Sequence, residues 1–273
     1  MHKAALVIFC LVCINCQSQP TGKIINIKGI TVEERFNPPE GFKRKNYSTG
    51  SFEYYLKNLP LKPSGSKVHT YDGSLKQPDN VYEAVLNMDV GDKDLQQCAD
   101  AVMRLRAEYL FAAKRYDEIH FNFTNGNKAE WEKYAAGYRF QPKSNSWVKT
   151  AKEDNSYKSF KEYLELVFTY AGSLSLSREL KPIDVEDMEP GDVFIKGGSP
   201  GHAVIVLDVV EDSKTDVKLF ILAQSYMPAQ EIQILKNGIP ADILSPWYTT
   251  DFGPYLKTPE WTFTRSQLMR FKD

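Results

Sequence analysis

The chain has 273 residues, of which 42% are hydrophobic and 25% charged. That length leaves room for one large domain or two small ones, and the composition excludes a collagen, a coiled coil and a wholly disordered chain. Lysine and arginine number 34 against 35 aspartates and glutamates, a net charge of −1, so the basic excess typical of nucleic-acid binders is missing and we expect no nucleic-acid partner.

The first 16 residues read MHKAALVIFCLVCINC, with a basic Lys3 before an apolar run from Ala4 to Ile14. Such a run has the length of a signal-peptide core and is too short to span a bilayer as a helix. We therefore predict a signal peptide at 1–15 and a polar tether at 16–23. Cleavage before Cys16 resembles the processing of bacterial lipoproteins, which implies a lipid on Cys16 that anchors the protein in the bacterial cell envelope. Ordinary secretion is the main alternative, and a buried apolar strand is a minor one.

Further elements are predicted from apolar periodicity and turn residues. Strands are expected at 25–32, 81–88, 118–123, 192–195, 203–210, 218–224, 231–235 and 261–264. Helices are expected at 51–59, from Asp92 or Asp94 to about Lys114, at 128–136 and at 159–170. Helices first and an antiparallel sheet afterwards predict the α+β class. The simplest interpretation is one domain over 24–273, with 24–90 as an N-terminal extension in the alternative.

Once a signal peptide is removed and Cys16 is lipidated, Cys98 is the one cysteine left. It follows Leu95 by three positions, on the apolar stripe of the predicted helix, where its ordinary role is core packing. The functional interpretation depends on its position about one turn from the helix start. Aligned peptide dipoles and unpaired N–H groups there favour an anion, which lowers the pKa of a thiol.

A thiolate needs a base, and four histidines are available. His2 lies in the signal peptide, His69 in a turn-rich stretch and His120 in a predicted strand. His202 instead follows the turn GGSPG and opens AVIVLDVV, a strand that is apolar on both faces and therefore central and buried. A histidine at the mouth of such a strand can reach a cleft, although a structural role fits it equally well.

The next strand places a polar side chain beside His202. If Val210 pairs with Val217, an antiparallel register brings His202 opposite Ser225, and a slip of one residue brings Gln224 there. An amide so placed can fix the ring and its tautomer, which is the task of the third member of a catalytic triad.

This order, a cysteine on a helix, a histidine at a strand start and an amide on the partner strand, resembles the papain-like cysteine peptidases. PGDVFIKGGSPGHAVIVLDVV is similar to their cell-wall branch, the NlpC/P60 and CHAP amidases, over about 90–235. The resemblance implies a papain-like helix packed on an antiparallel sheet, with Cys98 as nucleophile, His202 as base and Gln224 as orienting residue. Ser225 and Gln97 are candidate supporting residues. Those amidases carry Asp-Cys-Ser/Gly at the helix start, whereas Cys98 is expected about one turn inside.

The whole chain also resembles an uncharacterised family of bacterial lipoproteins, a domain of unknown function. The stretches that carry this resemblance are LQQCADAVMRLRAEYL, GDVFIKGGSPGHAVIVLDVV, AQSYMPAQEI and TPEWTF. The family implies no established activity.

Two functions of different classes follow from these features. The leading hypothesis is an envelope-anchored thiol hydrolase that cleaves a peptide amide in or near peptidoglycan. The alternative is a catalytically inactive module of the same fold that binds a wall peptide, a glycan or an envelope protein. The sequence has no HExxH and no paired Cys/His spacing, so we expect no metal and no cofactor. Gln96 or Gln97 is a candidate oxyanion donor, and at least one of Arg104 and Arg106 is expected to face solvent.

Overall fold

The computed structural model describes residues 23–238 and 241–272. The predicted signal peptide and the lipidation site Cys16 lie outside them. The strands of the main sheet are β1 (Phe42–Arg44), β2 (Tyr82–Val85), β7 (Lys181–Pro182), β8 (Val193–Lys196), β9 (His202–Asp212), β10 (Lys218–Gln224), β11 (Gln233–Leu235), β12 (Trp247–Thr249) and β15 (Leu268–Arg270). They form an antiparallel, nine-stranded sheet in the order β2-β11-β10-β9-β8-β15-β7, with β1 beside β9 and β12 beside β10. The predicted α+β class is confirmed.

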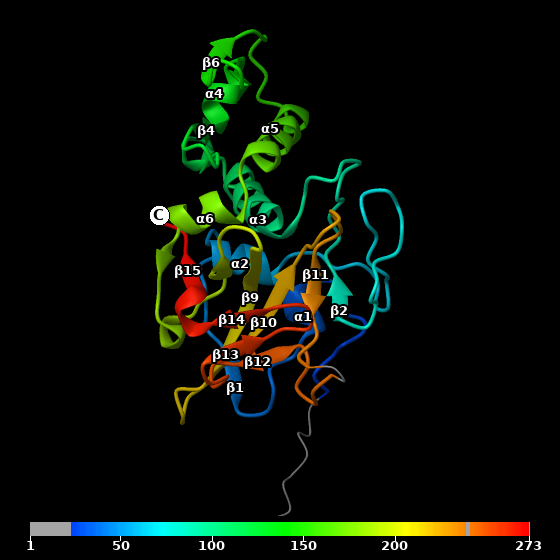
Figure 1. The fold of residues 1–273 in the computed structure, drawn as a ribbon. Coiled ribbons are helices and arrows are strands. Elements are labelled where there is room, and N and C mark those ends of the chain that lie inside the picture. Colours follow the sequence, from blue (N-terminus) through cyan, green and yellow to red (C-terminus); the bar gives the residue numbers. More distant parts are fainter. Residues whose placement is uncertain (1–22, 239–240, 273) are drawn as a thin grey trace, which may run out of the picture.

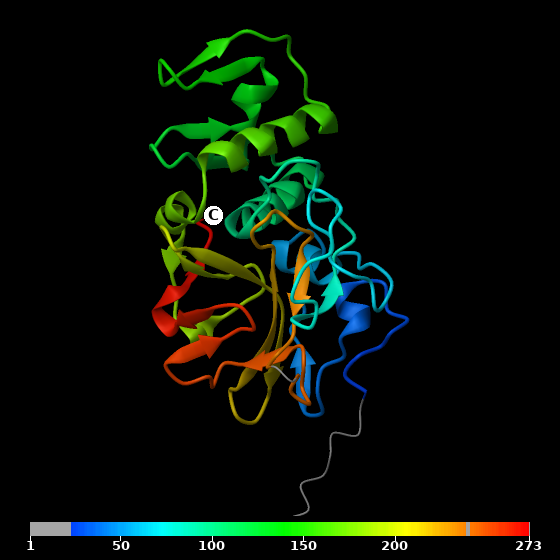
Figure 2. The same cartoon turned by 45° about the vertical axis from the view of Figure 1, so that its right-hand side comes forward.

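Helices and short hairpins surround this sheet. The helices are α1 (Val32–Arg35), α2 (Phe52–Lys57), α3 (Cys98–Ala112), α4 (Trp131–Ala135), α5 (Tyr157–Tyr170) and α6 (Ser173–Glu179), with 3-10 turns at Tyr116–Glu118, Val185–Asp187 and Arg265–Gln267. The hairpins pair β3 (His120–Asn122) with β4 (Lys128–Glu130), β5 (Tyr138–Gln141) with β6 (Ser146–Lys149), and β13 (Tyr255–Lys257) with β14 (Thr262–Thr264). The hairpins β3–β4 and β5–β6 form, with α4 and α5, a lobe that projects from the main body beyond α3 (Figures 1 and 2).

The long strand β9 is buried on both faces, as its sequence predicts. Ala203, Ile205 and Leu207 belong to the core cluster that includes the apolar side of α3. Val204 and Val206 belong to a second cluster, which includes side chains of β13 and β14. Because α3 packs against the first of these faces, the start of this helix lies close to the start of β9.

Residues before 90 and after 235 complete the sheet. The strand β1 pairs with the far end of β9, and β2 pairs with β11. From the C-terminal part, β12 extends the sheet beside β10 and β15 beside β8. The segments on both sides of residues 90–235 therefore share one hydrogen-bonded framework with them.

Two predicted elements are wrong for local reasons. Residues 25–32 form isolated bridges instead of a strand, because the side chain of Thr31 accepts from the N–H of Glu34 at 3.2 Å and starts α1. Residues 128–136 begin as the strand β4, where buried Ala129 pairs with Phe121, and become helical at Trp131.

Candidate active site

Cys98 is the first residue of α3, and the helix begins later than its sequence suggests. The carboxyl Oδ2 of Asp100 accepts the N–H of Gln97 at 3.0 Å, which fixes the helix start at this point. The expected capping residue Asp94 instead accepts from the side chain of Gln97 and from the N–H of Ala229. The expectation that Cys98 lies one turn inside the helix is therefore wrong, and its own N–H belongs to the turn that has no intrahelical acceptor.

His202 is the first residue of β9, and Gln224 is the last residue of β10. The ring nitrogen Nε2 of His202 lies 2.8 Å from Oε1 of Gln224, and both side chains are buried. The other ring nitrogen, Nδ1, makes no hydrogen bond with Gln224. The structure thus joins the histidine and the amide that the sequence placed side by side.

The register that brings them together differs from the predicted one. Leu219 pairs with Val210, and beyond an irregularity after Ile221 the pairing shifts by one, so that Ala223 pairs with Ile205. This bulge gives β9 one extra residue, which no sequence signal marks. The predicted pairing of Val210 with Val217 is therefore wrong: it would have put Ser225 on the face of His202, whereas the shifted register puts Gln224 there.

Cys98 and His202 line one pocket of about 390 Å³. The end of α5, the turn at 197–201 and the loop after β10 complete its wall, which includes the aromatic side chains of Phe168, Tyr226 and Trp261. The ring centroids of Tyr226 and Trp261 lie 4.9 and 5.2 Å from that of His202. Aromatic rings thus enclose the histidine and exclude water from much of its surface.

Burial controls the charge of both candidate catalytic groups. It raises the pKa of the Cys98 thiol to about 11, the carboxyl of Asp100 adds to this rise once it is ionised above pH 8, and the N–H of Ala203 opposes it. Burial also lowers the pKa of His202 to about 4, and the hydrogen bond that its Nε2–H donates to Gln224 opposes this change. Both groups are neutral at pH 7, so the lowered thiol pKa expected from the helix dipole is wrong in direction. Over 23–238 and 241–272, no hydrogen bond joins Cys98 to His202.

The candidate supporting residues brace the chain around Cys98. The hydroxyl of Ser225 is fully buried and donates to the carbonyl oxygens of Gln230 at 2.7 Å and Gln96 at 2.9 Å. Gln97 lines the pocket, and its side-chain amide donates to Asp94 at 3.1 Å. Ser225 therefore holds the backbone just before Cys98, and Gln97 is the glutamine that remains beside the site.

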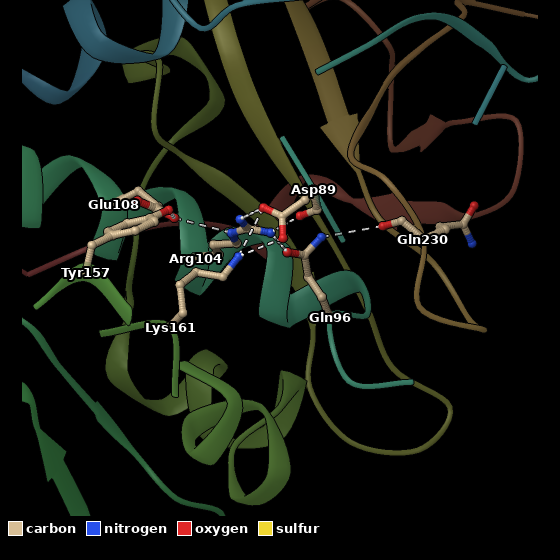
Figure 3. Close-up of polar contacts among 7 residues, drawn as sticks. All are labelled: Asp89, Gln96, Arg104, Glu108, Tyr157, Lys161 and Gln230. Carbon is tan, nitrogen blue, oxygen red and sulfur yellow. Dashed lines mark hydrogen bonds and ion pairs between the residues drawn. The ribbon is translucent and has the colours of Figure 1, made fainter. Parts of the chain in front are cut away.

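A buried arginine fixes the same loop from the other side. Figure 3 shows its cluster, which comprises Asp89, Gln96, Arg104, Glu108, Tyr157, Lys161 and Gln230. Arg104 is 2% exposed and donates to the side chain of Gln96 and to Asp89, whose Oδ1 lies 2.9 Å from Nη2. Arg106 is also buried, so the expectation of a solvent-facing arginine is wrong. With its oxygen on Arg104 and its amide group 3.5 Å from the carbonyl of Gln230, Gln96 is not an oxyanion donor.

Sequence reasoning missed three polar groups around the pocket. Asp100 lines it with a buried carboxyl, and Glu260, which is paired with Lys76, accepts a hydrogen bond from the side-chain amide of Gln224. Glu260 stands in the quoted stretch TPEWTF, but no pattern there connects it with a histidine 58 positions earlier (260 − 202). The other described histidines lie elsewhere, His69 beside Glu231 and His120 on β3.

No group of three or more His, Cys, Asp and Glu side chains among residues 23–238 and 241–272 is arranged to hold a metal ion. Within the same ranges, none of the helices has the length and apolarity that crossing a membrane requires.

Comparison of the chain with curated proteins gave no match, and comparison with solved structures gave none either. One family model, described as "Domain of unknown function (4846)", matches residues 32–270. This range includes the whole sheet and the pocket with Cys98, His202 and Gln224. The chain therefore belongs to this family of domains of unknown function.

Proposed function

We propose that the protein is a papain-like thiol hydrolase of the bacterial cell envelope, which cleaves a peptide amide in or near the cell wall. Cys98 is the nucleophile, His202 the base and Gln224 the residue that orients His202. One observation carries the proposal. A cysteine at a helix start and a histidine at a strand start line the same pocket, and the histidine is hydrogen-bonded at 2.8 Å to the side-chain amide of Gln224. This is the arrangement that the NlpC/P60 resemblance implies for these residues.

The neutral state of the pair suits general-base catalysis. As Sγ of Cys98 forms a bond to the carbonyl carbon, its proton passes to Nδ1 of His202, directly or through one water molecule. The carbonyl oxygen gains the negative charge at the start of α3, where the N–H of Cys98 is available to it. The attack therefore creates an imidazolium and an oxyanion from two groups that were uncharged before.

Collapse of this intermediate completes the first half-reaction. The C–N bond breaks, the amine leaves with the proton from His202, and a thioester to Cys98 remains. Water then attacks the thioester carbon and gives a proton to His202, and the carboxylic acid and the free thiol are released. Gln224 holds the imidazole ring in place during both transfers.

The pocket favours neutral or cationic groups beside the scissile amide. Of the described residues that line it, Asp94 and Asp100 carry carboxyl groups, and there is no lysine or arginine to bind a substrate carboxylate. Phe168 and Trp261 offer apolar faces for a side chain next to the bond. We therefore expect cleavage within a wall peptide, away from a free terminal carboxylate.

Hydrolysis of purified wall peptides, followed by mass spectrometry, tests the activity. Cys98→Ala should abolish product formation, and His202→Ala should lower kcat/KM by about 10²–10⁴-fold because the base is lost. His120→Ala, which removes a histidine from β3, is the matched control and should keep the rate. Equal rates for Cys98→Ala and the unchanged protein would overturn the proposal.

The proposed location is tested by fractionation of cells. Lys3, the apolar run before Cys16 and that cysteine itself support a lipid anchor. The unchanged protein should sediment with membranes, and Cys16→Ala should release it into the soluble extract. Recovery of both proteins in the soluble extract would exclude a lipid on Cys16.

The neutral pair also favours a second candidate, a binding module without chemistry. A thiol with a pKa of about 11 and no hydrogen bond to His202 can serve as part of an apolar wall. A wall peptide would then bind in the pocket with equal affinity to the unchanged protein and to Cys98→Ala, and calorimetry would detect heat while mass spectrometry found no product. Turnover by the unchanged protein alone would exclude this candidate.

A further inference from the structure

Both the oxygen and the nitrogen of the Gln224 side-chain amide make hydrogen bonds. Its Oε1 lies 2.8 Å from Nε2 of His202, and its amide nitrogen donates to Oε2 of Glu260 at 2.6 Å. A carboxylate accepts hydrogen bonds and donates none, so the group that faces Glu260 must be the NH₂ group of Gln224. Its oxygen is consequently the atom left for the histidine.

Glu260 is itself held by a buried cation. Its Oε1 lies 2.7 Å from Nζ of Lys76, and the two side chains are 11% and 3% exposed. The ammonium of Lys76 also lies 5.2 Å from the ring centroid of Tyr226, which contacts His202. A buried ion pair of this kind holds the carboxylate oxygens in fixed directions, because neither partner can turn to water without leaving the other unpaired.

We propose that Glu260, held by Lys76, is a positioning residue that sets the tautomer of His202 through Gln224. Since Gln224 offers His202 an acceptor, the ring proton must be on Nε2, and Nδ1 keeps its lone pair. Without the carboxylate, the amide can turn by half a rotation and offer its NH₂ group, which requires the opposite tautomer. The base would then have lost the lone pair that takes the thiol proton.

The parts of this relay come from segments that are far apart in the sequence. Lys76 lies in the loop between α2 and β2, Gln224 ends β10, and Glu260 lies between β13 and β14. The loop of Glu260 also supplies Trp261, whose ring lies 5.2 Å from that of His202, centroid to centroid. One loop therefore both covers the imidazole ring and directs its hydrogen bond.

The consequence for catalysis rests on the proposed function, whereas the tautomer can be measured without any substrate. Protein labelled with ¹⁵N-histidine reports by NMR which ring nitrogen carries the proton. The unchanged protein should show the Nε2–H form of His202. Glu260→Gln should raise the proportion of the Nδ1–H form about tenfold, because a charge-assisted hydrogen bond no longer fixes the amide. The four histidines of the chain are few enough to assign by single substitutions.

Two further variants keep the test decisive. The double variant Lys76→Met with Glu260→Gln removes both buried charges, so it avoids an unpaired ammonium and should show the same tautomer change if the single variant does not fold. The pair Lys67–Asp79 is the matched control, with a 2.7 Å ion pair and side chains 52% and 48% exposed. Lys67→Gln with Asp79→Asn should leave the tautomer unchanged.

An Nδ1–H form in the unchanged protein would overturn the proposal, and so would a tautomer that stays the same in both Glu260 variants. If wall peptides are hydrolysed, Glu260→Gln should also lower kcat about tenfold and leave KM unchanged, since the substrate does not contact Glu260. A tautomer change without any hydrolysis would uphold the relay and refute the hydrolase.

Discussion

Asp100 carries a carboxyl group whose burial lowers the stability of the folded protein at neutral pH. Oδ2 accepts the N–H of Gln97 at 3.0 Å, while Oδ1 is buried with no hydrogen-bond partner among the described residues. Burial raises the pKa of this carboxyl from 3.8 to about 8. At pH 7 it is therefore protonated in the folded protein and ionised in the unfolded chain, and unfolding releases a proton.

The sign and size of the stability effect follow from these two pKa values. The contribution of Asp100 is most favourable below pH 4, where both states are protonated, and it is lost as the pH rises to about 8. Each pH unit between the two pKa values lowers the free energy of unfolding by about 1.4 kcal/mol. Ionisation of Asp100 in the unfolded chain therefore lowers it by about 4 kcal/mol at pH 7 and by about 6 kcal/mol at pH 9, relative to low pH.

Asp100→Asn removes this cost, because asparagine does not ionise and its side-chain oxygen can still accept from Gln97. Urea unfolding followed by tryptophan fluorescence should give similar stabilities at pH 4, and the variant should be more stable by about 4 kcal/mol at pH 7. Asp92→Asn, which removes a carboxyl from an exposed position, is the control and should show no such trend. A difference between Asp100→Asn and the unchanged protein that is constant from pH 4 to 9 would refute the reasoning.

Three other predictions concern Cys98 and the residues that hold the loop before it. Because the pKa of Cys98 is about 11, its alkylation at pH 7 should be about 20-fold slower than that of free cysteine, after allowance for the greater nucleophilicity of a basic thiolate. A midpoint below 8.5, raised by His202→Ala, would instead indicate a thiolate–imidazolium pair. Arg104→Met should lower the free energy of unfolding by about 3 kcal/mol, because Asp89 and Glu108 lose the buried cation that pairs with them. An unchanged denaturation midpoint would contradict this. Ser225→Ala removes the hydroxyl proton that the buried carbonyls of Gln96 and Gln230 share, which leaves Gln230 only its 3.5 Å contact with the Gln96 amide, and it should cost about 1–3 kcal/mol in the same measurement. A loss below 0.5 kcal/mol would show that these carbonyls find other donors.

The central strands were predictable because their signals are local. AVIVLDVV is apolar at every position but one, and a strand of that composition must be covered on both faces wherever it lies. The turn before His202 and the amide at the end of the next strand are also short-range features. These three signals were enough to bring His202 and the end of β10 together, but the bulge in β9 decides that Gln224 and not Ser225 shares the face of His202.

The exact geometry of the candidate site depends on tertiary interactions that the sequence pattern does not show. The start of α3 was decided by Asp100 in competition with Asp94, two residues with equal capping propensity. The direction of the pKa shift of Cys98 depended on burial, which cannot be read from the helix position alone. Glu260 reaches Gln224 only after the chain has folded back from β13 to β14.

The burial of Cys98 has a chemical consequence that does not depend on the proposed hydrolysis. Peroxide and disulfide exchange attack thiolates, and a thiol that stays protonated at neutral pH is a poor target for both. The chain can therefore carry an unpaired cysteine in an oxidising compartment without losing it to sulfenic acid or to mixed disulfides. The resistance to oxidants and the slow alkylation that we expect of Cys98 have the same physical origin, the burial of its thiol.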